Sequence, residues 1–127
     1  MLREIRVERA IRRYLRDDDF DVEPRKSNTG VDIRARKAGR TWFVEVEGNA
    51  RKNGAPLKSP SARYTHFYRC VGQICRRIGE GDENSRYAIG LPEDEKYREY
   101  VGTVKKAFRL LGIHVFWVGE NNAVSMK

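Results

Sequence analysis

The feature that most constrains the fold is a pair of alternating segments between residues 31 and 47. Apolar side chains take every second position in residues 31–35, and the same alternation returns in residues 41–47. A period of two is typical of strands that bury one face. The four residues between them, 37–40, predict a hairpin loop. The two segments therefore predict an antiparallel pair of strands.

Helical patterns occur before and after this hairpin. Apolar residues recur at helical spacing in residues 3–16, 64–78 and 93–111. Further short strands are predicted at residues 20–24, 86–91 and 113–118, with an edge strand at 123–125. The expected fold class is α/β, with a mixed central sheet flanked by helices and the core order αβββαβ followed by a further αβ. One domain spanning residues 1–127 is expected.

The charge of the chain is unevenly distributed. The sequence has 26 Lys and Arg against 18 Asp and Glu, a net charge of +8. Residues 1–79 hold 19 basic and 10 acidic side chains, whereas residues 80–127 hold 7 and 8. A basic excess confined to one part of the chain indicates a surface that faces a polyanion, most commonly nucleic acid. A merely solubilising surface is the alternative.

Several classes of function are disfavoured. No apolar run approaches the roughly 20 residues of a membrane span, and the charged N-terminus shows no signal segment, so a cytoplasmic location is expected. No glycine-rich phosphate motif is present, so no nucleotide cofactor is expected. Two cysteines cannot supply a disulfide framework or a four-ligand zinc site, and Cys75 is expected in the core. His66 and His114 are interpreted as structural.

The hairpin brings carboxylates together. Pairing of residue 36 with residue 41 places Asp32 opposite Glu45, with Cβ atoms about 5 Å apart, and points Glu47 to the same side. Such like charges destabilise a sheet and raise each other's pKa. Mg²⁺ or Mn²⁺, held by Asp32 and Glu45, would remove this conflict and could activate water for phosphodiester cleavage. The alternative is an acidic face neutralised by nearby arginines: Arg34, Arg36 and Arg40.

These residues resemble the signature of a nuclease superfamily. The run Gly30–Ile33, then a hairpin, then Phe43–Gly48 is similar to the motif of the PD-(D/E)xK superfamily, and the likeness to its archaeal Holliday-junction-resolvase and Mrr-like branches covers most of the chain. That superfamily has a restriction-endonuclease-like fold with the order αβββαβ, which residues 3–91 match. The resemblance implies that Asp32 and Glu45 bind the metal.

Two further positions bear on this resemblance. In the family, a Glu of the first helix often joins the site, and Glu8 occupies the matching place. A solvated Glu8 among neighbouring arginines is the alternative. Glu47 stands where the family usually has Lys, although some restriction enzymes with Glu there are active. Glu47 therefore either orients or deprotonates the attacking water, or marks a protein that binds DNA without cleaving it.

A polar stripe on the helix at 64–78 supports a role on DNA. It consists of Arg69, Gln73, Arg76 and Arg77. Arginines suit bidentate phosphate contacts, and Gln73 resembles a family Gln that lies near the active site. Lys52 and Lys58 add positive charge after the metal-binding strand, and either is a candidate to replace the missing Lys. An ordinary solvated helix face is the alternative.

The predicted function is that of an Mg²⁺- or Mn²⁺-dependent endonuclease acting on DNA. A chain of 127 residues has little room for a separate specificity domain, so a homodimer that presents two sites to two strands is expected. The alternatives are a catalytically inactive DNA-binding module on the same fold and a protein-interaction subunit.

Overall fold

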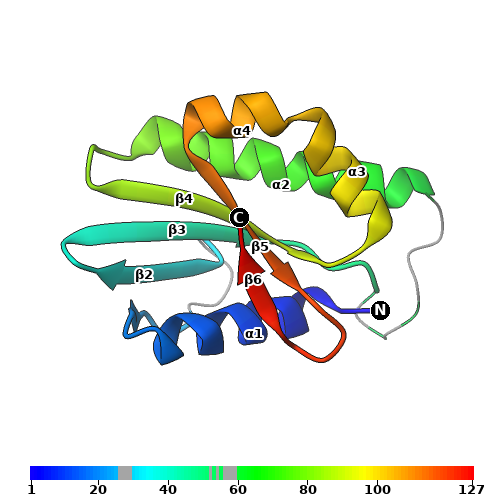
Figure 1. Ribbon diagram of the computed structural model, residues 1–127, viewed down its shortest axis with the longest axis horizontal. Coiled ribbons are helices and arrows are strands. Elements are labelled where there is room, and N and C mark those ends of the chain that lie inside the picture. The colour runs from blue at the N-terminus through cyan, green and yellow to red at the C-terminus, as the bar shows by residue number, and fades with distance from the viewer. Residues whose placement is uncertain (26–29, 52, 54, 56–59) are drawn as a thin grey trace.

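The fold is built on one six-stranded sheet with the strand order β1-β2-β3-β4-β5-β6 (Figure 1). The structure is a computed structural model that describes residues 1–127 except 26–29, 52, 54 and 56–59. The strands are β1 (Asp21–Val22), β2 (Ile33–Lys37), β3 (Arg40–Val46), β4 (Ser85–Pro92), β5 (Ile113–Val118) and β6 (Val124–Met126). The pairs β3–β4 and β4–β5 are parallel and the outer pairs are antiparallel. The predicted mixed sheet is confirmed.

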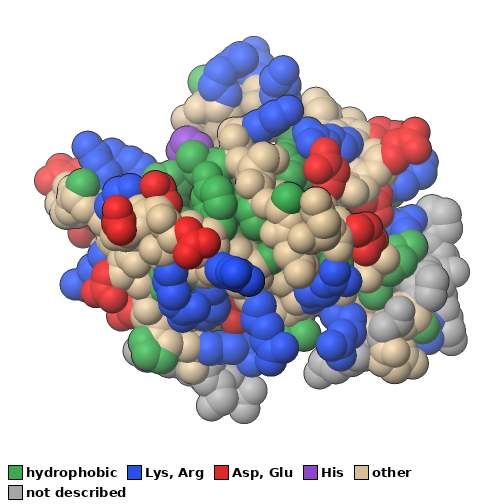
Figure 2. Space-filling model, turned by 60° about the horizontal axis from the view of Figure 1, so that its bottom comes forward, with side chains coloured by type: hydrophobic (Ala, Val, Ile, Leu, Met, Phe, Trp, Pro, Cys, Tyr) green, Lys and Arg blue, Asp and Glu red, His purple; other side chains and the backbone are tan. Residues whose placement is uncertain are grey.

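Helices cover both faces of the sheet. On one face lies α1 (Glu4–Asp17), and Figure 2 views the molecule from this side. On the other lie α2 (Pro60–Glu80), α3 (Glu95–Thr103) and α4 (Lys105–Leu111). The predicted core order αβββαβ is confirmed by the run from α1 to β4. Among the described residues, no helix is long and apolar enough to cross a membrane.

The segment 93–111 differs from its prediction, because it forms two helices instead of one. The break lies at Val104, whose φ and ψ are −114° and 13°. The residues before it, Gly102 and Thr103, have low helix propensity. The Thr103 hydroxyl also donates a hydrogen bond to the Tyr100 carbonyl at 2.6 Å, a local contact that competes with regular helix bonding.

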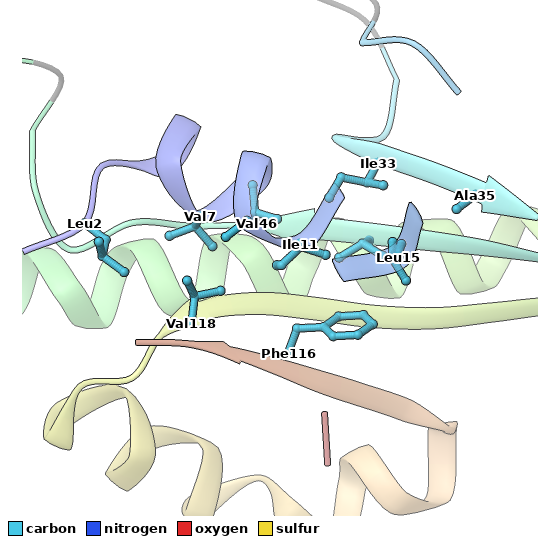
Figure 3. Close-up of a cluster of buried hydrophobic side chains, with 12 residues drawn as sticks. Leu2, Val7, Ile11, Leu15, Ile33, Ala35, Val46, Phe116 and Val118 are labelled. Carbon is cyan, nitrogen blue, oxygen red and sulfur yellow. The ribbon is translucent and has the colours of Figure 1, made fainter. Parts of the chain in front are cut away.

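The core on the α1 side follows the predicted helical stripe (Figure 3). Val7, Ile11 and Leu15 are at most 1% exposed. Their spacing of four residues places them on one side of α1, where they face the sheet. The sheet residues that pack with them come mainly from the inner strands: Ile33, Ala35, Val44, Val46, Ala88, Phe116 and Val118.

The core on the α2 side corrects one expectation. Phe67, Cys70 and Ile74 are fully buried against β4 and α3, whereas Cys75 is exposed. The prediction that Cys75 lies in the core is therefore wrong. The buried stripe of α2 runs through positions 67, 70 and 74, and Cys75 is rotated a further 100° around the helix.

The hairpin of β2 and β3 has the predicted register. Ile33 pairs with Val44 and Arg36 pairs with Thr41. Its loop is shorter than predicted, because Lys37 still pairs with Arg40 and only Ala38 and Gly39 form the turn. Both turn residues have positive φ, 53° and 76°. This is the conformation of a type I′ turn, whose twist matches that of the flanking strands.

Candidate active site

The predicted carboxylates meet where β2 begins and β3 ends. Asp32 directly precedes β2, and its Oδ2 accepts a hydrogen bond from the Val46 amide at 2.9 Å. Glu45 and Glu47 are 3% and 4% exposed, and both side chains contact α2. Because side chains alternate along a strand, Val46 between them enters the core on the α1 side. The hairpin thus brings the three carboxylates to one end of the sheet.

The carboxyl group of Glu45 lies in an unfavourable environment. Burial and the negative charge of Asp32 raise its pKa to about 7, although Arg77 opposes the shift. The Arg77 Nε atom lies 3.4 Å from its Oε1. The pKa of Asp32 is also raised by burial and by the charges of Glu8 and Glu47, against the hydrogen bond from Val46. The carboxylates repel one another, as the register predicts.

Glu47 is held by two side chains of α2. Its Oε1 lies 3.0 Å from His66 Nδ1, and its Oε2 accepts a hydrogen bond from Arg69 Nη2 at 3.2 Å. Arg69 Nη2 also lies 3.0 Å from His66 Nδ1, so the three groups form one cluster. His66 therefore belongs to the candidate site, which its isolated place in the sequence did not indicate.

Glu8 reaches the site from α1 as a buried ion pair. Its side chain lies 3.0 Å from Arg12 Nε and 2.9 Å from Arg25 Nε, and the residue is 1% exposed. The alternative of a solvated Glu8 is therefore wrong. Arg12 also donates hydrogen bonds to the backbone carbonyls of Asp32 at 2.7 Å and of Glu23 at 2.6 Å. The Arg12 guanidinium thereby connects α1 to Asp32.

Sequence reasoning missed Glu4, which lies one helical turn before Glu8. Partial burial and the negative charges of Glu47 and Asp32 raise the pKa of Glu4 to about 7. The signal was its spacing: positions 4 and 8 lie on the same side of a helix. We name the group Glu4, Glu8, Asp32, Glu45 and Glu47 the carboxylate cluster.

Close backbone packing fixes the start of α1 against the end of β3. A Cβ atom on Gly48 would lie 2.5 Å from the Glu4 nitrogen and 2.6 Å from the Leu2 carbonyl oxygen, so only glycine fits. The Leu2 amide donates to Asn49 Oδ1 at 2.7 Å beside this contact. Glu4 is therefore positioned relative to Glu47 by main-chain packing.

Two cavities open onto the carboxylate cluster. One is bordered by both helices and the end of β3: Glu4, Arg25, Glu47, Gly48, His66 and Arg69. The other opens beside the start of β2: Arg12, Val31, Asp32, Phe43, Arg77 and Glu80. Both combine carboxylates with arginines, which are the groups expected at a site for a phosphate and its metal ion.

The residues of the predicted DNA-binding stripe on α2 have different surroundings in the structure. Arg69 and Arg77 turn toward Glu47 and Glu45, whereas Arg76 is exposed. Gln73 is half-buried between them along the helix. Lys52 and Lys58 lie outside the described residues.

The arginines that neutralise the acidic hairpin differ from those that the sequence indicated. Arg34 pairs with Glu23 at 3.4 Å, and Arg36 and Arg40 are exposed. The counter-charges of Glu45 and Glu47 come instead from α2. The reason is that these two side chains point to the α2 side of the sheet.

The donor set of the cluster suits a hard divalent cation in its chemistry. In the part of the chain that the structure describes, no three His, Cys, Asp or Glu side chains are grouped as ready metal ligands. Asp32 and Glu45 nevertheless supply carboxylate oxygens whose pKa values are raised by burial and by neighbouring negative charge. Carboxylates of this kind are the ligands that Mg²⁺ prefers in proteins.

Two solved structures share the fold over nearly the whole chain. An XisH family protein from Nostoc punctiforme matches with a TM-score of 0.64 and 16% identity, covering 94% of this chain and 96% of its own. An fdxN element excision controlling factor protein from Anabaena variabilis matches with a TM-score of 0.62 and 15% identity, covering 94% and 95%. At these identities the likeness establishes the fold. No protein-family model and no curated protein matches the sequence.

Proposed function

We propose that the protein is an Mg²⁺- or Mn²⁺-dependent endonuclease that hydrolyses phosphodiester bonds in DNA. The observation that carries the proposal is the carboxylate cluster, in which acids with raised pKa values converge around the buried Glu45 in a chain of net charge +8. One structural neighbour is named as an excision controlling factor, and this adds support for a role on DNA.

The residues of the cluster take different roles in this proposal. Asp32 and Glu45 hold the metal ion, which when bound supplies Lewis acidity toward the attacking water and charge stabilisation at the phosphate. Hydrolysis joins the water oxygen to phosphorus and breaks one P–O ester bond, so a proton must leave the water and the departing sugar oxygen must take one up to leave as a hydroxyl. Glu47 is the acceptor for this proton, and His66 and Arg69 orient its carboxylate.

The direct test is incubation with linear, nicked and branched DNA in Mg²⁺ or Mn²⁺, against an EDTA control. We expect Asp32→Ala and Glu45→Ala to abolish cleavage while DNA binding persists, because each removes a metal ligand and no basic residue. Glu83→Ala, which changes an exposed carboxylate outside the lining of both cavities, is the matched control and should cleave normally. Full activity in both ligand variants would contradict the metal site.

Glu47 has a separate test, because two roles are open to it. As a proton acceptor, Glu47→Gln should lose about 10²–10⁴-fold in rate at every metal concentration. If Glu47 supplies only negative charge, the Glu47→Gln variant should recover its rate when the concentration of Mg²⁺ or Mn²⁺ is raised. Glu47→Lys restores the usual family residue and should then regain part of the activity. A Glu47→Gln protein with wild-type rate and metal dependence would exclude both roles.

The second candidate function is DNA binding without catalysis. It is favoured by Glu47 in the place of the family Lys and by the ion pairs that Glu45 and Glu47 form with arginines. Duplex binding without cleavage in any divalent metal would establish it. The homodimer expected from the sequence stays a prediction, and sedimentation equilibrium of the purified chain tests it.

A further inference from the structure

The side of α1 that points away from the core is lined by arginines. Arg6, Arg9, Arg13 and Arg16 follow one another at intervals of three, four and three residues, so they form a single stripe along the helix. The stripe lies opposite the buried side chains Val7, Ile11 and Leu15. In Figure 2, Lys and Arg side chains gather over the middle and lower part of this face.

Within the residues that the structure describes, three of these arginines have no counter-charge. Arg9, Arg13 and Arg16 are exposed, and no side chain in the described part of the structure forms an ion pair or hydrogen bond with any of them. Arg6 differs, because its Nε donates to Asn122 Oδ1 at 3.0 Å and its guanidinium contacts Glu120. We name Arg9, Arg13 and Arg16 the α1 arginine stripe.

Two members of the α1 arginine stripe, Arg9 and Arg13, border a groove. The groove runs between α1 and the turn that joins β5 to β6, and its lining includes Arg9, Arg13, Tyr14, Asn121 and Asn122. Guanidinium and amide groups on its walls can donate hydrogen bonds to anionic oxygens. Asp17 at one end is the carboxylate in this lining. The groove is therefore a concave surface with arginines on its walls.

We propose that the α1 arginine stripe binds the phosphate backbone of duplex DNA, at a surface separate from the carboxylate cluster. Guanidinium groups bind phosphate in a bidentate manner, and all five basic residues of α1 are arginines. From Arg9 to Arg16 the helix rises about 10 Å. This length corresponds to roughly three base-pair steps of about 3.4 Å, measured along the DNA helix axis.

An anionic membrane surface is the competing partner, and the structure disfavours it. Helices that lie on membranes insert an apolar face beside their basic residues. The apolar face of α1 is buried in the core, with Val7 and Ile11 fully inaccessible. The exposed side of α1 thus offers charge without apolar anchors, which suits a soluble polyanion.

The test compares two variants that lose the same charge. One carries Arg9→Gln, Arg13→Gln and Arg16→Gln, and the control carries Lys105→Gln, Lys106→Gln and Arg109→Gln at exposed positions of α4. Glutamine keeps helix propensity close to that of the basic residues. Affinity for a 20-base-pair duplex is measured by fluorescence anisotropy over about 50–200 mM salt.

We expect the stripe variant to bind at least about 10-fold more weakly at the low-salt end, with a salt slope smaller by nearly three units, about 0.9 for each lost phosphate contact. The control should change the slope by less than one unit. Equal losses in both variants, or wild-type binding by the stripe variant, would overturn the proposal. Loss of binding to phosphatidylserine vesicles with unchanged duplex affinity would assign the stripe to membranes instead.

This outcome is independent of catalysis. Asp32→Ala removes a proposed metal ligand and leaves the α1 arginine stripe intact, so it should bind the duplex as the wild type does. A protein that never cleaves DNA but loses affinity in the stripe variant would reject the proposed nuclease activity and support the α1 surface. Normal cleavage with unchanged duplex affinity in the stripe variant would support the proposed nuclease activity and reject the α1 surface as a DNA-binding site.

Discussion

Arginines serve opposite purposes in the carboxylate cluster and in the α1 arginine stripe. In the cluster, Arg12, Arg25, Arg69 and Arg77 each pair with a buried or nearly buried glutamate. In the stripe, no arginine is paired within the described part of the chain. The comparison shows that the sequence of a helix indicates how many positive charges it carries. The carboxylates that pack around the helix then determine how many of these charges are free to bind a ligand.

The largest expected effect separates neighbouring arginines of these two groups. Arg12 is 7% exposed and contacts Glu8, Glu23 and Asp32, whereas Arg13 is exposed. Arg12→Ala should lower the free energy of unfolding by about 3–5 kcal/mol, because it breaks a buried ion pair. Arg13→Ala should stay within about 0.5 kcal/mol of the wild type. Urea unfolding of both variants measures the difference, and similar losses would show that the two arginines are not distinct.

A second prediction tests the joint between α1 and the carboxylate cluster. Gly48→Ala places a Cβ atom against the backbone of Leu2 and Glu4, and it should destabilise the fold by about 1–3 kcal/mol. Gly72→Ala is the matched control. Its Cβ would meet nothing within 4 Å in the interior of α2, so it should stabilise by about 0.5–1 kcal/mol. Thermal unfolding compares them, and a neutral Gly48→Ala would show that the two segments separate easily.

A third prediction concerns pH. The pKa of Glu45 is raised to about 7, so between pH 4.5 and 7 the folded state holds a proton that the unfolded state has lost. Its contribution to stability is therefore complete below pH 4.5 and is lost as the pH rises through 7. Glu45→Gln should remove a decline of up to about 3 kcal/mol over this range.

Urea unfolding at a series of pH values measures this decline. Glu83→Gln, an exposed carboxylate, is the control and should leave the decline unchanged. Millimolar Mg²⁺ should stabilise the wild type more at pH 8 than at pH 5, because the ion binds ionised carboxylates. A Glu45→Gln protein with the wild-type pH profile would contradict the raised pKa.

The smallest expected effect distinguishes Arg76 from Arg77 on α2. Arg76 is exposed, so Arg76→Ala should lower the salt slope of duplex binding by about one unit if it contacts a phosphate. Arg77 is engaged by Glu45, so Arg77→Ala should change the slope less. Arg77→Ala should instead extend the pH-dependent loss of stability to higher pH, because Arg77 lowers the pKa of Glu45 and its removal lets this pKa rise further. Identical slopes in the two variants would remove the distinction.

Local patterns were sufficient to predict the fold and the meeting of the carboxylates. Alternation fixed which side chains of residues 33–37 and 40–46 face the α1 side, and the observed register is the one that brings Asp32 beside Glu45. The turn at Ala38 and Gly39 was predicted too long, since a two-residue loop depends on positive φ at both positions. Ala38 did not indicate such a turn, because Asn, Asp and Gly are the residues usually found at these positions.

Counter-charges could not be predicted, because they depend on tertiary packing. Whether Arg77 points to solvent or to Glu45 depends on how α2 lies across the sheet, and helical periodicity does not encode this arrangement. The same reason explains why His66 was interpreted as merely structural and why Glu4 was missed. The spacing of Glu4 and Glu8 was informative only once the start of α1 was known to lie beside Glu47.

The chain order of the sheet also determines when the carboxylates acquire their partners during folding. Asp32 and Val46 are 14 residues apart and belong to one hairpin, whereas Glu45 and Arg77 are 32 residues apart and meet only after α2 has crossed the sheet. Hairpins close in about 1–10 μs, and contacts over longer separations form more slowly. From these separations we expect the acids to gather before the arginines of α2 reach them, so that their mutual repulsion opposes early closure of the hairpin.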